Sequence, residues 1–177
     1  NKKYLKGRQY KSSNNLDARI AIHQYGSKES FHEWIWNQLK IDRPISVLDV
    51  GCGSGTFWKE NYSKLPLGSK LLLTDLTEGM VNKAKTSVTG DNIKFKIEDI
   101  DNLTLDDDSF DVVMAHHVIY HADDKDKALK ELKRVTKKNG FVTITTNSEK
   151  HMLNVYTIGR ELDENFPCDR IIDSFTE

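Results

Sequence analysis

The sequence is poor in cysteine and has no long apolar run. Its 177 residues include only two cysteines, Cys52 and Cys168. Two thiols give no disulfide framework, and a reducing, cytoplasmic setting fits them. The chain has neither an apolar run near the roughly 20 residues that a membrane span needs nor the basic start and apolar run of a signal peptide. We therefore expect neither a disulfide-stabilised secreted domain nor a membrane protein.

An excess of charge of one sign is also lacking. The formal net charge is -1, and 37% of the residues are hydrophobic and 30% charged, which fits a single globular domain with a real core. This balance gives no general case for binding nucleic acid or an anionic membrane. The basic residues within positions 1–15 fit a solvated arm better than a nucleic-acid site. Nucleic acid is therefore an unlikely partner on these grounds.

The most informative stretch is an apolar run that leads into three alternating glycines. Residues 45–50 predict a buried strand, and residues 56–62 predict a helix. Between them lie Gly51, Gly53 and Gly55, whose lack of a side chain lets a ligand approach the backbone. The N–H groups at the start of the following helix favour binding at the same place. The pattern predicts a nucleotide-type binding loop.

The glycine spacing and one acid distinguish this loop from a dinucleotide site. The sequence reads G-x-G-x-G, whereas the dinucleotide fingerprint is G-x-G-x-x-G. Asp49 lies just ahead of the first glycine. Its carboxylate would repel a pyrophosphate, but it suits an ammonium, a sulfonium or sugar hydroxyls. A nicotinamide-dependent oxidoreductase is therefore disfavoured.

Strands and helices alternate along the rest of the chain. Further strands are expected at residues 70–74, 93–97, 109–115 and 141–145. A helix over residues 29–39 should bury a face formed by Phe31, Trp34, Ile35 and Leu39, and a later helix should begin at Asp123 and stop at Gly140. This alternation predicts an α/β, doubly wound, open parallel sheet of Rossmann-like type with strand order 3-2-1-4-5.

Acidic residues follow the second and third of these strands. Asp75 lies at the tip of the second strand, where doubly wound nucleotide folds accept hydrogen bonds from ribose hydroxyls. The third strand runs into Glu98 and Asp99. Because the carboxyl ends of parallel strands share one edge of the sheet, these acids and the glycine loop should surround one pocket beside the first strand.

Three segments resemble the class I S-adenosylmethionine-dependent methyltransferases. The loop from Asp49 to Gly55 is similar to motif I of that family, the run from Asp75 to Met80 to its post-I motif, and residues 111–124 to its segment after strand four. The resemblance implies S-adenosylmethionine as cofactor, S-adenosylhomocysteine as product and methyl transfer to a small-molecule acceptor. It implies cofactor contacts from Asp49, Gly51, Cys52, Gly53, Gly55, Asp75, Leu76, Met80, Asp99, Ile100 and His116, with Glu98 as the alternative to Asp99.

Three histidines after the fourth strand are candidates for a catalytic base. His116, His117 and His121 carry imidazoles, which titrate near working pH. His117 and His121 are spaced as in zinc-binding helices, but the glutamate of the H-E-x-x-H motif is absent, so no metal is expected. In-line displacement depends mostly on alignment, so a mechanism without a dedicated base stays open beside these candidates.

The resemblance divides the chain into three parts. Residues 1–42 would form an N-terminal arm and lid helices, residues 43–147 the S-adenosylmethionine-binding core, and residues 148–177 a C-terminal helix and a truncated extension. A complete class I domain continues with an antiparallel hairpin, so the resemblance implies that this C-terminal hairpin is absent. The edge of the fifth strand would then be exposed, and either self-association or cover by the last residues would protect it.

Two other functions remain as alternatives. An RNA methyltransferase would use the basic arm for binding RNA, and that binding would depend on salt. A cofactor-binding fragment would bind S-adenosylmethionine but methylate no acceptor. The sequence does not identify the acceptor or the atom that is methylated.

Overall fold

The sheet has the predicted class and strand order. The computed structural model describes residues 29–147 and residue 161. It contains a five-stranded sheet in the order β3-β2-β1-β4-β5, and every neighbouring pair of strands is parallel. The strands are β1 (Ser46–Val50), β2 (Lys70–Asp75), β3 (Ile93–Ile97), β4 (Phe110–His116) and β5 (Thr136–Thr145). The prediction of an open, doubly wound parallel sheet is confirmed.

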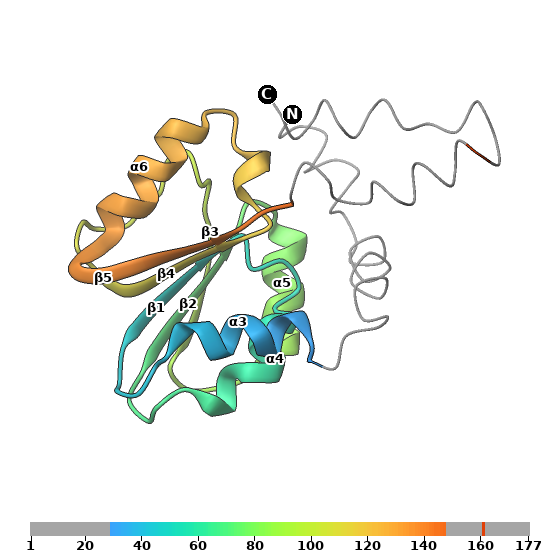
Figure 1. Cartoon of the computed structure of the whole chain (residues 1–177), viewed down its shortest axis with the longest axis vertical. Helices are drawn as coiled ribbons and strands as arrows, with labels where there is room; N and C mark the ends of the chain where they lie inside the picture. The colour runs from blue at the N-terminus through green and yellow to red at the C-terminus, as the bar shows by residue number, and fades with distance from the viewer. Residues whose placement is uncertain (1–28, 148–160, 162–177) are drawn as a thin grey trace.

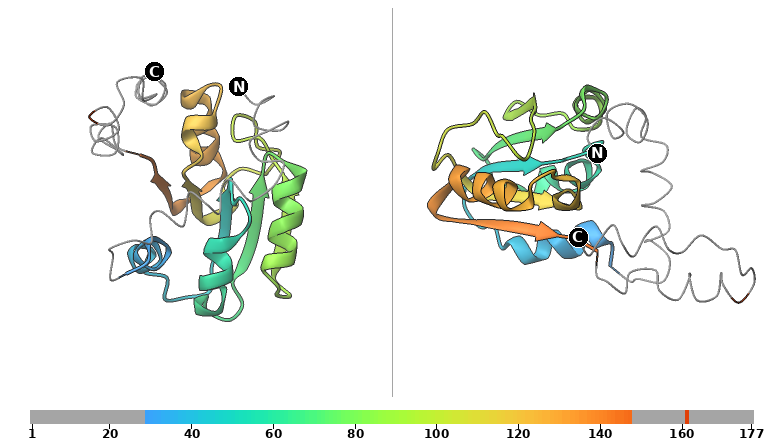
Figure 2. Two further views of the ribbon diagram at one scale, coloured as in Figure 1. Left: turned by 90° about the vertical axis from the view of Figure 1, so that its right-hand side faces the viewer. Right: turned by 90° about the horizontal axis from the view of Figure 1, so that it is seen from above.

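Helices cover both faces of the sheet and give three layers (Figures 1 and 2). One face carries α3 (Phe31–Leu39), α4 (Thr56–Asn61) and α5 (Glu78–Ser87), and the other carries α6 (Lys125–Val135). Two short 3-10 helices, η2 (Tyr62–Lys64) and η3 (Ile119–His121), follow α4 and β4. None of the helices in the described part of the chain has the length and hydrophobicity of a membrane span.

β1 and β4 are buried on both faces of the sheet along most of their length. Side chains alternate across a strand, so Val47 packs beneath α3 and α4, whereas Leu48 packs beneath α6. β1 is apolar along most of its length for this reason, as expected of a strand between two helical layers. β3 lies at an edge, and its Lys94 and Lys96 are exposed, which agrees with its alternating sequence.

The expected apolar face of α3 is partly wrong. Ile35 and Leu39 are buried, but Phe31 and Trp34 are 40% and 48% exposed. Trp36, which is not part of the predicted face, packs partly buried against the same core. The helix begins after Ser30, whose hydroxyl accepts from the Glu33 N–H at 3.1 Å. Its first turn lies beyond the edge of the core, which leaves the aromatic rings of that turn uncovered by the sheet.

The end predicted for α6 is also wrong. The helix is capped by Asp124 rather than Asp123, and it ends at Val135, after which the chain enters β5 directly. Gly140 does not form a left-handed helix stop. It lies at an irregularity in the β4–β5 register, where an added Cβ would come within 2.6 Å of the Asp111 carbonyl oxygen. The glycine is needed for this close approach of two backbones.

Several predicted segments lie outside the described residues. These are the arm and first lid helix within residues 1–28 and nearly all of the C-terminal helix and extension expected within residues 148–177, of which only Glu161 is described, in helical conformation. The division of the chain into three parts therefore stays a prediction. At the edge strand β5, Phe141 and Ile144 are 42% and 39% exposed, and the predicted self-association through this edge also stays a prediction.

Candidate functional site

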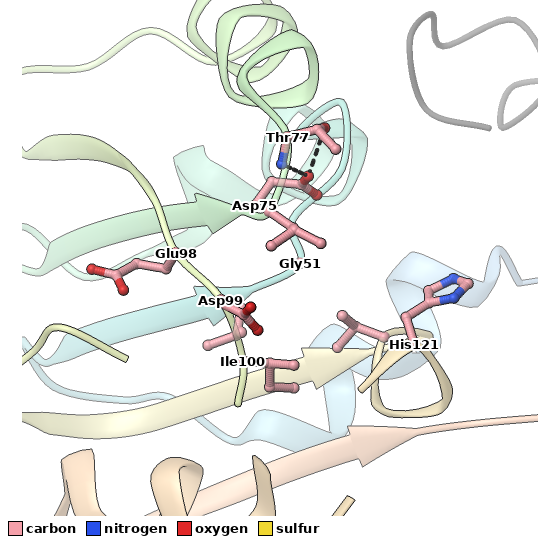
Figure 3. Close-up of a pocket in the computed structure, with 10 residues that line it drawn as sticks. Gly51, Asp75, Thr77, Glu98, Asp99, Ile100 and His121 are labelled. Carbon is pink, nitrogen blue, oxygen red and sulfur yellow. Dashed lines mark hydrogen bonds between the residues drawn. The ribbon is translucent and has the colours of Figure 1, made fainter. Parts of the chain in front are cut away.

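A pocket lies where the carboxyl ends of β1, β2 and β3 meet the loop after β4 (Figure 3). This is the point at which the strand order reverses beside β1, where open α/β sheets bind their ligands. Three of the strands and the segment that follows β4 contribute its walls. The lining residues are Val50, Gly51, Asp75, Leu76, Thr77, Glu98, Asp99, Ile100, Val118 and His121.

The glycine loop requires its glycines. Gly51, Gly53 and Gly55 have φ angles of 77°, 57° and 77°, a region that strains any residue with a Cβ. The N–H groups of Gly51 and Cys52 both donate to the Thr74 carbonyl at 2.8 Å, which ties the loop to the end of β2. A Cβ on Gly51 would lie 2.5 Å from a methyl carbon of Val118. The loop is therefore held tightly between β2 and the segment after β4.

Asp75 ends β2 and holds the glycine loop on the other side. Its Oδ1 accepts from the Thr77 N–H and hydroxyl, each at 2.9 Å, and its Oδ2 accepts from the Gly53 N–H at 3.2 Å. Burial raises the pKa of Asp75 despite these three bonds. Because a carboxylate has about four acceptor positions, the side chain keeps capacity for a ligand hydroxyl at the pocket wall.

Asp49 lies beneath the loop rather than on the pocket wall. It is 5% exposed, and its Oδ2 accepts from the Trp58 indole N–H at 2.7 Å. Burial raises its pKa to about 7, the indole bond acts in the opposite direction, and the charge of Asp75 adds to the rise. Burial also raises the pKa of the neighbouring Cys52 thiol, with contributions from the same two carboxylates. The loop thus rests on a carboxyl group that burial favours in its neutral form.

The two acids after β3 have different environments. Asp99 turns toward the pocket, whereas the carboxylate of Glu98 points away from it (Figure 3). Glu98 accepts from the Thr104 N–H and hydroxyl at 2.8 and 2.7 Å and pairs with Lys96 at 2.6 Å. Burial opposes ionisation of Glu98, but these bonds keep its pKa below the usual value. Glu98 thus stabilises the turn after β3, and the geometry favours Asp99 over Glu98 as the acid that contacts a ligand in the pocket.

Of the three candidate histidines at and after the end of β4, only His121 lines the pocket. It does so from η3. His116 ends β4, and its Nε2 lies 3.0 Å from the Thr143 hydroxyl. Burial lowers the pKa of His116 to about 4, with contributions from His117 and His32, so its imidazole is neutral at neutral pH. His117 has a φ of 52°, and its N–H donates to Thr145 at 2.9 Å.

Sequence reasoning missed a group of side chains from α3 and α4. The ring of Phe31 lies 5.3 Å from that of His117, and Nδ1 of His32 lies 2.9 Å from Oε2 of Glu60. The ring of Phe57 lies 5.7 Å from that of His32 and 6.0 Å from that of His116. No motif joins His32 to a glutamate 28 positions away. Only the placement of α3 against α4 brings them together.

Some of the remaining predicted cofactor contacts line the pocket, and others do not. Leu76 and Ile100 line the pocket, whereas Met80 is 2% exposed on α5 and is not among the lining residues. Cys52 is half-buried with a free thiol. Within residues 29–147, no group of three or more His, Cys, Asp or Glu side chains is placed to hold a metal ion. The cofactor roles of these residues stay predictions.

The chain matches a known family across most of the described residues. The family described as "Methyltransferase domain" matches residues 48–144, which run from β1 to the end of β5. The match therefore includes the glycine loop, Asp75, Asp99 and the histidines after β4.

Individual proteins support the same assignment. A demethylmenaquinone methyltransferase of Bacteroides fragilis is 33% identical over 140 residues, covering 75% of this chain and 57% of that protein. An uncharacterized methyltransferase of Schizosaccharomyces pombe is 31% identical over 141 residues, covering 73% and 49%. The chain thus spans about half the length of the curated relatives it matches.

A solved structure agrees in fold. The structure described as a complex between the Haloferax volcanii Trm112 methyltransferase activator and the putative methyltransferase has a TM-score of 0.62 and 24% identity, and the match covers 80% of this chain and 64% of that chain.

Proposed function

The chain belongs to the class I S-adenosylmethionine-dependent methyltransferases, and on this basis we propose that the protein transfers a methyl group from S-adenosylmethionine to a small-molecule acceptor. One observation carries the proposal. The glycine loop, Asp75 and Asp99 come from three different strands, and they converge on one pocket at the carboxyl edge of the sheet. A set of unrelated surface acids would not gather at this edge beside three glycines of positive φ.

The residues present fit an adenosyl group. Asp75 offers acceptor capacity for ribose hydroxyls, and Asp99 faces the same space for the amino group of the adenine. Val50, Leu76 and Ile100 supply apolar walls for a flat ring. When bound, S-adenosylmethionine supplies a methyl group on a positively charged sulfur. Among the predicted contacts, Gly51 also lines this pocket.

The side chains around the sheet edge suit a positively charged ligand. Asp49 and Asp75 are carboxyl groups close enough for their charges to interact, and a cation nearby would favour their ionised forms. His116 is neutral at neutral pH, so it adds no positive charge at the end of β4. Burial around these groups strengthens each electrostatic interaction because the local dielectric is low. The protein would thereby orient the cofactor and exclude water.

A small-molecule acceptor agrees with the name of the Bacteroides relative, which refers to demethylmenaquinone. The RNA alternative rests on the basic arm within residues 1–28, outside the described residues. We retain it as an outcome of the test, together with cofactor binding without activity. A cytoplasmic location also stays a prediction.

The proposal is tested by titration followed by transfer. Calorimetry with S-adenosylmethionine, S-adenosylhomocysteine and NADH should show binding of the first two and not of the third. The full-length gene product should then move a labelled methyl group to a quinol or another small molecule. Binding of NADH in preference to S-adenosylmethionine would overturn the family-based activity. Transfer to RNA alone, or no transfer to any acceptor, would replace the small-molecule proposal by one of the two alternatives.

A further inference from the structure

The first turn of α3 lies at the carboxyl edge of the sheet, beside the end of β4 (Figures 1 and 2). Two of its residues meet the histidines there: the ring of Phe31 packs at 5.3 Å from that of His117, and His32 is close enough to His116 to lower its pKa. The pocket proposed for the adenosyl group lies mainly at the ends of β1, β2 and β3, with Val118 and His121 from the segment after β4, and no residue of α3 or α4 lines it. The α3 cluster therefore occupies the side of the site that the adenosyl pocket leaves for an acceptor.

His32 is held by a carboxylate. Its Nδ1 lies 2.9 Å from Oε2 of Glu60, and the two side chains are 18% and 43% exposed. An ionised carboxylate only accepts hydrogen bonds, so a neutral His32 carries its proton on Nδ1 and keeps a lone pair on Nε2. A carboxylate that fixes the tautomer and orientation of an imidazole is the arrangement by which enzymes prepare a general base.

The groups around His32 are mostly uncharged rings. Phe57 of α4 meets its imidazole edge-on at 5.7 Å, and Phe31 lies beside it on α3. Phe31 and Trp34 stack at 6.3 Å with an interplanar angle of 15° and are both partly exposed. The titratable neighbours are Glu60 on α4 and His116 and His117 at the end of β4. A planar ring could stack on the exposed aromatic surface and place a polar group beside His32.

We propose that His32, oriented by Glu60, is the catalytic base of the reaction, and that the acceptor is a hydroxyl group on an aromatic ring. This inference rests on the proposed function, because it assigns the acceptor side of the same site. The choice of His32 rests on its own bond to a carboxylate. His116 instead bonds to a threonine.

The proposed step balances without another reactant. The acceptor O–H bond breaks, and its proton passes to Nε2 of His32, which becomes an imidazolium paired with Glu60. The oxygen uses the electron pair to form a bond to the methyl carbon, and the electrons of the carbon–sulfur bond remain on sulfur. The imidazolium later returns its proton to water. His32 thus acts only on the acceptor proton.

Two acceptors of different acidity can show whether His32 acts as a base or has only a structural role. Phenol keeps its proton until about pH 10, like a tyrosine side chain, whereas 4-nitrophenol is a much stronger acid and is largely ionised at about pH 8. We expect His32→Gln to reduce methylation of phenol by about 100-fold or more, because general-base catalysis contributes at least this factor. The loss for 4-nitrophenol should stay below about tenfold. Glu60→Gln should change both rates in the same pattern but less strongly.

Controls use the same helix and a readout other than turnover. Glu33→Gln removes an exposed carboxylate from the first turn of α3 and should leave both rates unchanged. Calorimetric affinity for S-adenosylmethionine should be unaffected in the His32→Gln and Glu60→Gln variants. In spectra of imidazole-labelled protein, 4-nitrophenol should shift one histidine signal, and that signal should be missing in His32→Gln.

Each contrary result has a definite meaning. Equal losses for both phenols, or no shifted histidine signal, would overturn the role of His32 as a base. Failure to methylate either phenol by a protein that binds S-adenosylmethionine would overturn the acceptor class and leave the proposed function standing. Failure to bind S-adenosylmethionine would overturn the proposed function itself.

Discussion

At the amino end of the sheet Asp111 and Arg134 meet partners of opposite charge. At the carboxyl end Glu98 is also paired, with Lys96, but Asp49, Asp75 and His116 are buried among neutral or like-charged neighbours. At the amino end, the Asp111 carboxylate accepts from the Ser46 N–H and from Lys137, both at 2.8 Å. Burial opposes its ionisation, but these bonds hold the pKa of Asp111 far below its usual value. Arg134 binds Glu131 nearby, and the bond lowers the pKa of Glu131 and raises that of Arg134.

The carboxyl end shows the opposite directions. Burial raises the pKa values of Asp49 and Asp75 and lowers that of His116, so each group is moved toward its neutral form. Stability alone would favour the amino-end arrangement, in which Asp111, Glu131 and Arg134 each have a partner of opposite charge. Titratable groups shifted toward neutrality are a recognised mark of a functional site, and of these three groups Asp75 lines the pocket. The difference is the one expected if the amino edge serves stability and the carboxyl edge serves the proposed binding of a cofactor.

The largest expected effect is a difference in pH dependence between Asp49→Asn and the wild type. Asp49 has a pKa of about 7 in the folded protein and a usual value of 3.8. A raised folded pKa gives stability that is present below pH 3.8 and is lost as pH rises through 7. The wild type should therefore lose roughly 4 kcal/mol relative to Asp49→Asn across this window, since one pKa unit corresponds to about 1.4 kcal/mol. Denaturant unfolding at several pH values measures this.

Asp111→Asn is the control from the amino end. The folded pKa of Asp111 is lowered, so its contribution to stability is present above the unfolded value and is lost as pH falls. As pH rises, the free energy of unfolding of Asp111→Asn should therefore fall further below that of the wild type. The free energy of unfolding of Asp49→Asn should instead rise relative to that of the wild type. Slopes of the same sign for both variants would remove the contrast between the two edges.

The next effect concerns two glycines with positive φ, one at each edge. Gly51→Ala should lower the free energy of unfolding by about 2–4 kcal/mol, because a left-handed backbone costs about 1–2 kcal/mol and the contact with Val118 adds to it. Gly68→Ala, at φ 91° with no atom nearer than 3.8 Å, should cost only the backbone part. Calorimetry should show that Gly68→Ala keeps its affinity for S-adenosylmethionine and that Gly51→Ala loses it. An equal loss of unfolding free energy in the two variants would show that Val118 moves aside without a measurable cost.

Much of this comparison could be predicted from the sequence. The alternation of apolar runs with helical segments predicts a doubly wound sheet, and the rules for parallel crossovers leave few strand orders, of which 3-2-1-4-5 is the predicted one. The glycine loop and Asp75 are local motifs, and each lies where its own strand ends. These features depend on residues close together in the sequence, so the pattern contains the necessary information.

Other features depend on packing between distant segments. The pairing of His32 with Glu60 needs α3 against α4, and the choice of Asp99 over Glu98 needs the position of Thr104. The exposure of Phe31 depends on how far α3 extends past the sheet. The β5 irregularity at Gly140 depends on the neighbouring backbone of β4. Periodicity identifies a helix or a strand, but it does not say which part of the element has a neighbour.

The smallest expected effect is that of Asp75→Asn on cofactor binding. The substitution keeps the size of the side chain but replaces one acceptor oxygen with a donor NH₂, so it mismatches either the Gly53 N–H or a ligand hydroxyl. We expect the affinity for S-adenosylmethionine to fall by about 1–2 kcal/mol, a typical cost of an unpaired polar group. Asp91→Asn, at an exposed position ahead of β3, should leave the affinity unchanged. Thermal unfolding without cofactor separates this loss from a loss of stability, since Asp75 also bonds Thr77. An unchanged calorimetric affinity in a folded Asp75→Asn protein would assign the ribose to another acceptor and leave Asp75 as a support for the loop.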